Sequence, residues 1–377
     1  MRPLGRKVVS LMTFPTRFEW EKLQQFCSEL FEKVGVPKEK AEIVADSLVQ
    51  ADLRGVDSHG IVRTAIYLER IEKNMINPFA EIVVEKESEA TVLVNGNNNI
   101  GSVIGTKALT IAMKKAKEQG AAIVGVRGSN HFGTGAYYLL KAIEQDMILL
   151  VVSNASQTMP PTGGVRPFIG TNPLSVGAPA NKYPPFILDM ATSVVARGKI
   201  IVAAQKGESI PLGWAIDKDG NPTTDANAAL DGSVLPVGGP KGYGISMFID
   251  ILAGVLTGAG YGKYVNNMYE NWEEVQNVGH FFIAIDINRF IPIELFKERM
   301  DRYISEIKAE PKAEGIEEIL IPGEIEHRLV QKRKEEGIEL PLKVAKELYE
   351  IGMRYQVDLN KAAYLKNGEE KQEALKK

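Results

Sequence analysis

The chain has 377 residues, of which 44% are hydrophobic and 25% are charged. This length predicts about two or three domains with cores of their own, and the composition is typical of folded globular proteins, which excludes a disordered chain. With 45 basic and 48 acidic side chains the net charge is −3, so charge gives no support to binding of nucleic acid or a membrane surface. A single cysteine and four histidines argue against a disulfide and a metal site, and we expect neither.

Three segments of the chain bear on the cellular location of the protein: its start, its end and its most apolar stretch. The apolar run at residues 8–12 is too short for a secretory signal, so we expect a cytoplasmic protein. The segment Gly244–Gly260 is too short to span a membrane and contains Asp250, so it predicts a buried helix and no membrane partner. The Lys- and Glu-rich end, Asn367–Lys377, is expected to fray.

The first segment of the chain predicts three helices. One starts from Thr16, a candidate cap, and a second follows Pro37 and ends near Gly55. A third begins near Ser58 and runs to about Asn74. Apolar residues recur in the first helix at the spacing of one buried face, at Leu23, Phe26, Cys27, Leu30 and Phe31.

The middle of the chain alternates between strands and helices, and the chain turns helical again after Pro292. We therefore predict an α+β protein in which a mixed domain, residues 79–291, is inserted into a helical domain built from residues 1–78 and 292–377. β-branched and apolar runs predict strands at Ile82–Val84, Thr91–Val94, Ala121–Val126, Met147–Val152, Phe186–Leu188 and Phe281–Ile287, and helices are expected at Ile104–Glu118 and Gly135–Gln145.

Two common nucleotide-binding motifs are absent from the sequence. No GxGxxG follows a strand and opens a helix, because the Gly pairs at 133–135 and 238–242 have the wrong spacing. No phosphate-binding loop with its lysine occurs either, since the run at 96–102 lacks the lysine. A Rossmann domain is therefore not expected.

The run from Asp57 to Arg63 carries the first candidate catalytic group. His59 lies where one predicted helix has ended and the next begins, and Arg63 follows one helical turn later on the same side. An imidazole that exchanges a proton, beside a guanidinium that grips a carboxylate, suits a 2-oxo or 2-hydroxy acid. The alternative is a capping turn with a solvated histidine and a surface arginine.

A second histidine, His131, directly follows the predicted strand that ends near Val126 and lies between glycines. Ends of strands flanked by glycine often display reactive side chains. The alternative is a histidine that only bonds the backbone of a tight turn. For His280 and His327 we expect structural or solvated roles.

Two further runs resemble anion-binding segments. In residues 236–244 the glycines and Lys241 precede the apolar helix, so the helix N-terminus and the lysine together make a candidate anion site. Residues 189–193 follow a strand and offer Thr192 and Ser193 to a phosphate or ribose. Both runs also read as a simple turn and a helix cap.

Seven motifs together resemble the type-2 malate/L-lactate dehydrogenase family, in the expected order from about residue 16 to 360. Members are NAD(P)-dependent oxidoreductases that act on malate, lactate, sulfolactate, ureidoglycolate or diketogulonate, and some relatives reduce cyclic imines. The resemblance implies NAD or NADP as cofactor, a non-Rossmann cofactor domain with a mixed or antiparallel sheet, and a homodimer. The motifs are ADLRGVDSHGIVR (51–63), SNHFG (129–133), GTNPL (170–174), LDMATS (188–193), PLGWAIDKDGNPTTD (211–225), GGPKGYG (238–244) and PGE (322–324).

The resemblance also implies roles for individual residues. His59 matches a proton donor of some members and His131 a proton acceptor of others, and we favour His59. Ser58 and Arg63 match substrate-side positions, with Arg63 as the carboxylate grip. Thr171 and Asn172 are expected in the same pocket, and the cofactor positions are Asp189, Met190, Ala191, Thr192, Ser193, Lys241, Gly242, Gly323 and Glu324.

The expected activity is hydride transfer between nicotinamide and a small 2-hydroxy or 2-oxo acid, with malate and oxaloacetate preferred. The other acids of the family and cyclic imines are the alternatives. A non-redox lyase and a cofactor-binding regulatory protein are alternatives of a different class. One departure from the family is a short linker before Lys241, which puts contacts made by a longer loop in doubt.

Overall fold

The computed structural model describes residues 15–364. The expectations for residues 8–12 and for Asn367–Lys377 lie outside this range. Within it, no helix has the length and apolar character needed to cross a membrane.

A seven-stranded mixed sheet forms the centre of the protein. Only β3 and β4 run parallel, and all other neighbouring strands are antiparallel. This arrangement confirms the predicted α+β class with a non-Rossmann sheet. Across the sheet the strands are β2 (Val83–Glu87), β3 (Thr91–Asn95), β4 (Ala121–Ser129), β11 (Val278–Asp286), β5 (Met147–Ser153), β6 (Leu174–Ala178) and β7 (Phe186–Met190). The sequence did not predict β6.

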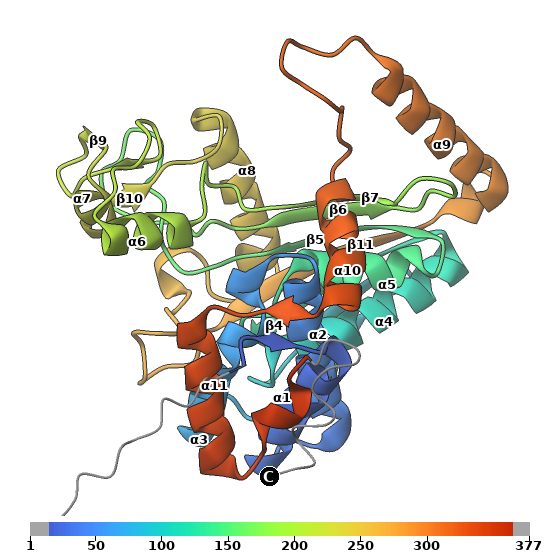
Figure 1. The fold of residues 1–377 in the computed structure, drawn as a ribbon. Helices are drawn as coiled ribbons and strands as arrows, with labels where there is room; N and C mark the ends of the chain where they lie inside the picture. The colour runs from blue at the N-terminus through green and yellow to red at the C-terminus, as the bar shows by residue number, and fades with distance from the viewer. Residues whose placement is uncertain (1–14, 365–377) are drawn as a thin grey trace, which may run out of the picture.

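Helices cover both faces of the sheet (Figure 1). The helices α4 (Gly101–Gln119) and α5 (Gly135–Ile143) pack on one face, as their apolar residues predict, and share a core with the strands. On the other face lies α8 (Pro240–Asp250), which continues as a wider π-helical turn over Ile251–Val255.

The prediction of a fully buried helix over Gly244–Gly260 is wrong. Only one side of α8 packs inward, where Ile249 joins Val152 and Phe281 in a small core. The outer side of the helix has no covering element among the residues described. Its exposed apolar side chains are Ile245, Met247, Phe248, Ile251, Val255 and Leu256.

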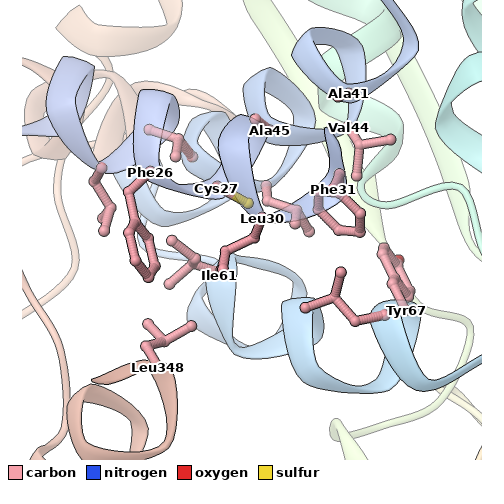
Figure 2. Close-up of a cluster of buried hydrophobic side chains, with 14 of the residues drawn as sticks. Phe26, Cys27, Leu30, Phe31, Ala41, Val44, Ala45, Ile61, Tyr67 and Leu348 are labelled. Carbon is pink, nitrogen blue, oxygen red and sulfur yellow. The ribbon is translucent and has the colours of Figure 1, made fainter. Parts of the chain in front are cut away.

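A helical unit lies below the α4 and α5 layer in Figure 1. It draws on both ends of the chain, because β1 (Arg17–Phe18) pairs with β12 (Ile338–Glu339). Its core packs aromatic and aliphatic side chains from the first helices against Leu348, as Figure 2 shows. The helices are α1 (Trp20–Lys33), α2 (Lys38–Leu53), α3 (Thr64–Glu72) and α11 (Leu342–Tyr355).

Two sequence expectations in this unit need correction. Thr16 does not cap α1, which begins at Trp20; the Thr16 carbonyl instead accepts a hydrogen bond from the backbone of Leu340. The segment from Ser58 to Asn74 is not one helix, because two 3-10 turns, Asp57–His59 and Ile61–Arg63, precede α3. The extended backbone of Gly60 separates these turns.

The remaining elements lie around the β6 and β7 side of the sheet. A small subdomain with its own core follows β7. It contains α6 (Arg197–Lys206), α7 (Ala226–Asp231), β8 (Ala215–Ile216), β9 (Pro222–Thr223) and β10 (Ser233–Val234). The helix α9 (Ile293–Ala309) is held to the loop between β6 and β7. Its Asp301 carboxylate accepts hydrogen bonds there from the backbone N–H groups of Asn181 and Lys182. Next in the chain is α10 (Glu324–Glu336), and short 3-10 turns lie at Gly262–Tyr264, Ile287–Arg289 and Leu359–Ala362.

Candidate active site

The fold brings the two candidate histidines together. His59 lies in the 3-10 turn that follows α2, and His131 lies just beyond the end of β4. Their ring centroids are 5.3 Å apart and both side chains are partly buried. A substrate small enough to enter this pocket can therefore meet both imidazoles.

A buried carboxyl group shapes the loop that carries His59. Asp52 is 1% exposed, and its Oδ2 accepts a hydrogen bond from the Ile61 backbone at 2.8 Å. At Gly60 a Cβ atom would lie 1.8 Å from the Asp52 carboxylate, so the turn requires glycine there. Burial raises the pKa of Asp52 to about 8, which keeps this carboxyl largely neutral at pH 7.

The same loop is also held from α10. The Arg333 guanidinium donates to the Asp57 carboxylate at 2.5 Å and to the backbone carbonyl of Asp52. The turn that carries His59 is therefore held both by Asp52 at the end of α2 and by Arg333 of α10, which is distant in sequence.

Next to His59, Arg63 lies where the sequence predicted. Its Nε donates to the Ser58 carbonyl at 2.7 Å, and Ser58 Oγ lies 2.9 Å from His59 Nδ1. The Arg63 Nη groups donate no hydrogen bond to residues 15–364, so both are free to hold a carboxylate. The guanidinium carbon stands 5.4 Å from the centre of the Tyr269 ring.

His131 is held by two partners that the sequence analysis did not identify. Its Nδ1 lies 2.5 Å from the Tyr67 hydroxyl, and its backbone N–H donates to the Gln276 side chain at 2.9 Å. Tyr67 follows Arg63 by one helical turn, so its position on the same face was a usable signal. Gln276 and Tyr269 come from a distant loop that carries no local signal.

Burial keeps both histidines neutral. It lowers the pKa of His59 to about 4, with a further contribution from the Arg63 charge. It also lowers the pKa of His131 well below its ordinary value, and His59 and Arg63 add to the effect. Burial raises the pKa of the Tyr67 phenol, which therefore keeps its proton. Each imidazole is thus a base ready to accept a proton at pH 7.

The other two histidines lie outside this pocket. His280 is fully buried between Ser153 Oγ at 2.8 Å and Ser129 Oγ at 2.7 Å, a structural role that agrees with the expectation. His327 lies in α10, away from the histidine pair.

Thr171 and Asn172 support the region between the sheet and α8. Asn172 is fully buried, and its side-chain amide bonds the Ala155 N–H and the Ser246 carbonyl, both at 2.9 Å. The Thr171 carbonyl accepts from the Thr192 backbone at 3.0 Å. The Asn172 amide is therefore engaged with backbone groups, whereas Thr171 stays next to the candidate cofactor residues.

Three separate segments meet along β7, and we call them the cofactor strip: residues 187–193, 236–242 and 322–324. β7 runs through Met190, so the strand does not end at Leu188 as the sequence suggested. On one side Ser193 bridges to Pro236, and on the other the Ile187 N–H donates to the Pro322 carbonyl at 3.0 Å. All nine predicted cofactor positions belong to this strip.

The groups that the cofactor strip leaves available fit an anionic dinucleotide. The buried Thr192 hydroxyl has no hydrogen-bond partner among the residues described. Lys241 is exposed in the first turn of α8, whose N-terminal amides have no side-chain cap. At Gly242 a Cβ would lie 2.0 Å from the Val237 carbonyl oxygen, so only glycine lets the loop close on the helix.

Two acidic residues of the strip have structural partners. Asp189 accepts from Ser175 Oγ at 2.6 Å and from the Ala136 N–H at 2.8 Å, and burial raises the pKa of this carboxyl. Glu324 accepts from Lys308 Nζ at 2.8 Å and from the Ile321 backbone. Because Ala136 lies at the start of α5, just after His131, Asp189 links the strip to the histidine pocket.

No cluster of three or more potential metal ligands occurs in the described part of the chain.

Comparison with known proteins shows the family of this chain. A family model described as malate/L-lactate dehydrogenase matches residues 18–349. A malate dehydrogenase of Pyrococcus horikoshii is 43% identical over 346 residues, which cover 90% of this chain and 95% of the relative. A malate/(S)-sulfolactate dehydrogenase of Methanothermus fervidus is 42% identical over 331 residues, which cover 88% of this chain and 96% of the relative.

A solved structure extends the likeness to three dimensions. The sulfolactate dehydrogenase of Methanocaldococcus jannaschii superposes with a TM-score of 0.87 at 42% identity, covering 92% of this chain and all of that one. Relatives whose names specify a cofactor use NAD+ or NADP+. Fold, site and relatives thus define an NAD(P)-dependent dehydrogenase of 2-hydroxy acids. The chain belongs to the malate/L-lactate dehydrogenase family.

Proposed function

We propose that this enzyme interconverts malate and oxaloacetate, with His59, His131 and Arg63 as its reacting and binding groups. The observation that carries this assignment is the meeting of two neutral imidazoles, 5.3 Å apart, beside a guanidinium with free Nη groups. Malate is preferred because two similar relatives carry malate in their names. The other acids of the family remain the alternative substrates.

In the oxidative direction a neutral histidine accepts the proton of the substrate hydroxyl while C2 loses hydride. Arg63 holds the carboxylate through its Nη groups, which fixes C2 relative to the imidazole. In the reductive direction the same histidine, now protonated, returns the proton to the oxygen at C2. The chemistry that NAD(P) supplies when bound is reversible hydride transfer.

Two observations favour His131 as the proton acceptor, although the sequence alone favoured His59. The Nδ1 of His131 is held by a buried tyrosine hydroxyl, whereas the Nδ1 partner of His59 is the exposed Ser58. A ring fixed from one nitrogen directs the other toward substrate. His59 then lies beside the carboxylate grip as a second polar contact.

For the cofactor we propose the nine predicted positions of the cofactor strip. Lys241 and the amides at the start of α8 suit the pyrophosphate, and the unpartnered Thr192 hydroxyl offers a further hydrogen bond. Asp189 and Glu324 shape this surface through their internal bonds and do not need to contact the cofactor with their carboxylates.

The experiment that tests the function is a panel of NADH and NADPH oxidation with oxaloacetate, pyruvate, sulfopyruvate and a cyclic imine, paired with thermal shifts for each cofactor. We expect the highest kcat/KM with oxaloacetate. Faster turnover of another acid would replace malate and keep the site. Thermal stabilisation without any turnover would favour a cofactor-binding regulatory protein, and no response to either cofactor would favour a non-redox lyase.

Three broader features belong to the same proposal: a homodimer, a cytoplasmic location, and a division into a helical domain (1–78 and 292–377) and a cofactor domain (79–291). The exposed apolar side of α8 supports the homodimer, since a large apolar patch on a surface commonly marks an interface. Light scattering measures the assembly directly, and a monomeric mass at micromolar concentration would contradict it.

A further inference from the structure

We propose that a single water molecule is bound in a small cavity lined by His131, Arg70 and Asn130, and that this water selects the base-competent tautomer of His131. The second half of the proposal rests on the proposed function, in which His131 accepts the substrate proton. Tyr67, His131, Arg70, Asn130 and Gln276 all line the cavity.

Arg70 supplies hydrogen-bond donors that have no partner. Its side chain is 1% exposed, and only Nη1 is engaged, through the carbonyl groups of Met268 and Asn271 at 3.0 Å each. The Nε and Nη2 groups are buried without a hydrogen bond. Among residues 15–364 no carboxylate offsets this charge, and burial lowers the pKa of Arg70. The guanidinium carbon of Arg70 also stands 5.4 Å from the centre of the Trp272 ring, a cation–π contact.

Asn130 supplies an acceptor that has no partner. Its Nδ2 donates to Asn98 Oδ1 and to the Asn99 carbonyl, both at 2.9 Å. Because both of these partners are acceptors, the amide cannot be flipped, and Oδ1 is the group left over. This oxygen is buried without a partner in a residue that is 1% exposed.

The small size of the cavity and the unpartnered groups of Arg70 and Asn130 that line it identify its ligand. The cavity has room for about one bound water. A carboxylate, with three heavy atoms, needs more room than one water. A halide ion would accept from Arg70 but would face the Asn130 oxygen, whereas water accepts from the guanidinium and donates to that oxygen.

The effect on His131 follows from counting donors and acceptors at Tyr67. His131 is a base only if Nε2 carries the lone pair, so Nδ1 must carry the proton and donate to the Tyr67 oxygen. The Tyr67 O–H then needs another acceptor, because a buried donor without a partner is costly. The proposed water accepts from Tyr67 and from Arg70 and donates to Asn130. Without the water, Tyr67 would donate to Nδ1 and the proton would move to Nε2.

Two measurements on the wild-type enzyme test the proposal. A high-resolution crystal structure should show one ordered water within hydrogen-bond distance of Arg70, Tyr67 and Asn130, and it should persist after a bromide soak. With ¹⁵N-labelled histidine, of which the chain has only four, NMR should show His131 protonated at Nδ1. An empty cavity, an anomalous bromide peak in it, or a proton on Nε2 would each overturn the proposal.

A matched pair of variants tests the role of Arg70. Arg70→Lys removes the unpartnered fork and should move the His131 proton to Nε2 and lower kcat for hydroxy-acid oxidation by roughly tenfold. Lys73→Met is the control, because Lys73 contacts the same Trp272 ring from 4.0 Å and does not line the cavity. If Arg70→Lys leaves the tautomer unchanged, the water does not select it. If Arg70→Lys does not fold, the two wild-type measurements still decide.

Failure of this inference is distinguishable from failure of the proposed function. Normal turnover in a His131→Gln variant would remove His131 as the base, but the water and the tautomer would still be measured. An Nε2-protonated His131 in an active malate dehydrogenase would overturn the inference and leave the activity intact.

Discussion

The histidine pocket and the cofactor strip differ in how far their polar groups are satisfied within the protein. In the pocket each Nδ1 has a side-chain partner, Ser58 for His59 and Tyr67 for His131. In the strip, Thr192 has no partner and Lys241 is exposed. The difference indicates that the protein pre-positions its proton-transfer groups, whereas the strip keeps groups available for a ligand. Changes in the pocket should therefore act on turnover or on binding of the acid, and changes in the strip on cofactor binding.

The largest expected effect comes from removing the imidazoles. His131→Gln should lower kcat by roughly 10²- to 10⁴-fold, because the proton acceptor is lost while an amide of similar size remains. His59→Gln should have a smaller effect if His59 is only a polar contact. Steady-state kinetics of NADH-linked reduction measure both.

His327→Gln is the matched control for these two variants, since His327 lies in α10 outside the pocket and should leave kcat unchanged. A near-normal kcat for His131→Gln, together with a large loss for His59→Gln, would exchange the two roles.

Arg63→Lys should raise KM for the acid roughly 10- to 100-fold with a smaller change in kcat, because a lysine ammonium does not reproduce the two-pronged grip on a carboxylate. Initial rates over a range of acid concentrations separate the two parameters. Arg302→Lys is the control, since Arg302 is an exposed residue of α9 that pairs with Glu306. An unchanged KM would remove Arg63 from the substrate pocket.

How much of this pocket can be predicted from the sequence depends on how far apart its residues lie in the chain. The turn with His59 and Arg63 is local, so its motif made both residues candidates, and the family resemblance then implied their roles. The β-branched and apolar runs also predicted most strands of the sheet, because buried strands such as β4 and β5 are rich in these residues. Gln276 and Tyr269 escaped notice because tertiary contacts alone bring their loop to the histidines.

The misjudged helix illustrates a second limit of the sequence. The apolar run in α8 predicted burial on all sides, but hydrophobicity does not say whether the covering surface belongs to the same chain. One side packs on the sheet through Ile249, and the other, including Phe248, is exposed. The two 3-10 turns before α3 were similarly missed, since only the fold shows that the Asp52 carboxylate accepts a hydrogen bond from the Ile61 backbone.

A smaller effect is expected in the cofactor strip. Lys241→Met should raise KM for NADH or NADPH by about 3- to 10-fold and leave kcat nearly unchanged, because it removes one exposed charge from an anion site that keeps its backbone amides. Fluorescence titration with the reduced cofactor measures the change in Kd. Lys343→Met, at an exposed position in α11, is the control. Equal affinities in both variants would place the pyrophosphate elsewhere.

The smallest effect on turnover is expected at Asp52, where the readout is stability. The pKa of this carboxyl is about 8 in the folded protein and about 3.9 in an unfolded chain. Between these values the folded state holds one more proton, so its contribution to stability is complete at low pH and is lost as the pH rises through 8.

Asp52→Asn does not titrate and keeps an oxygen that can accept from Ile61. The stability of the wild type relative to this variant should therefore fall between pH 5 and pH 8, by at most about 1.4 kcal/mol per pH unit, and become constant at higher pH. Urea unfolding of both proteins at each pH gives this difference directly, and the many other titrating groups cancel from it. Parallel stability curves for the two proteins would mean that Asp52 is already ionised at low pH and that the turn below His59 is held mainly by Arg333.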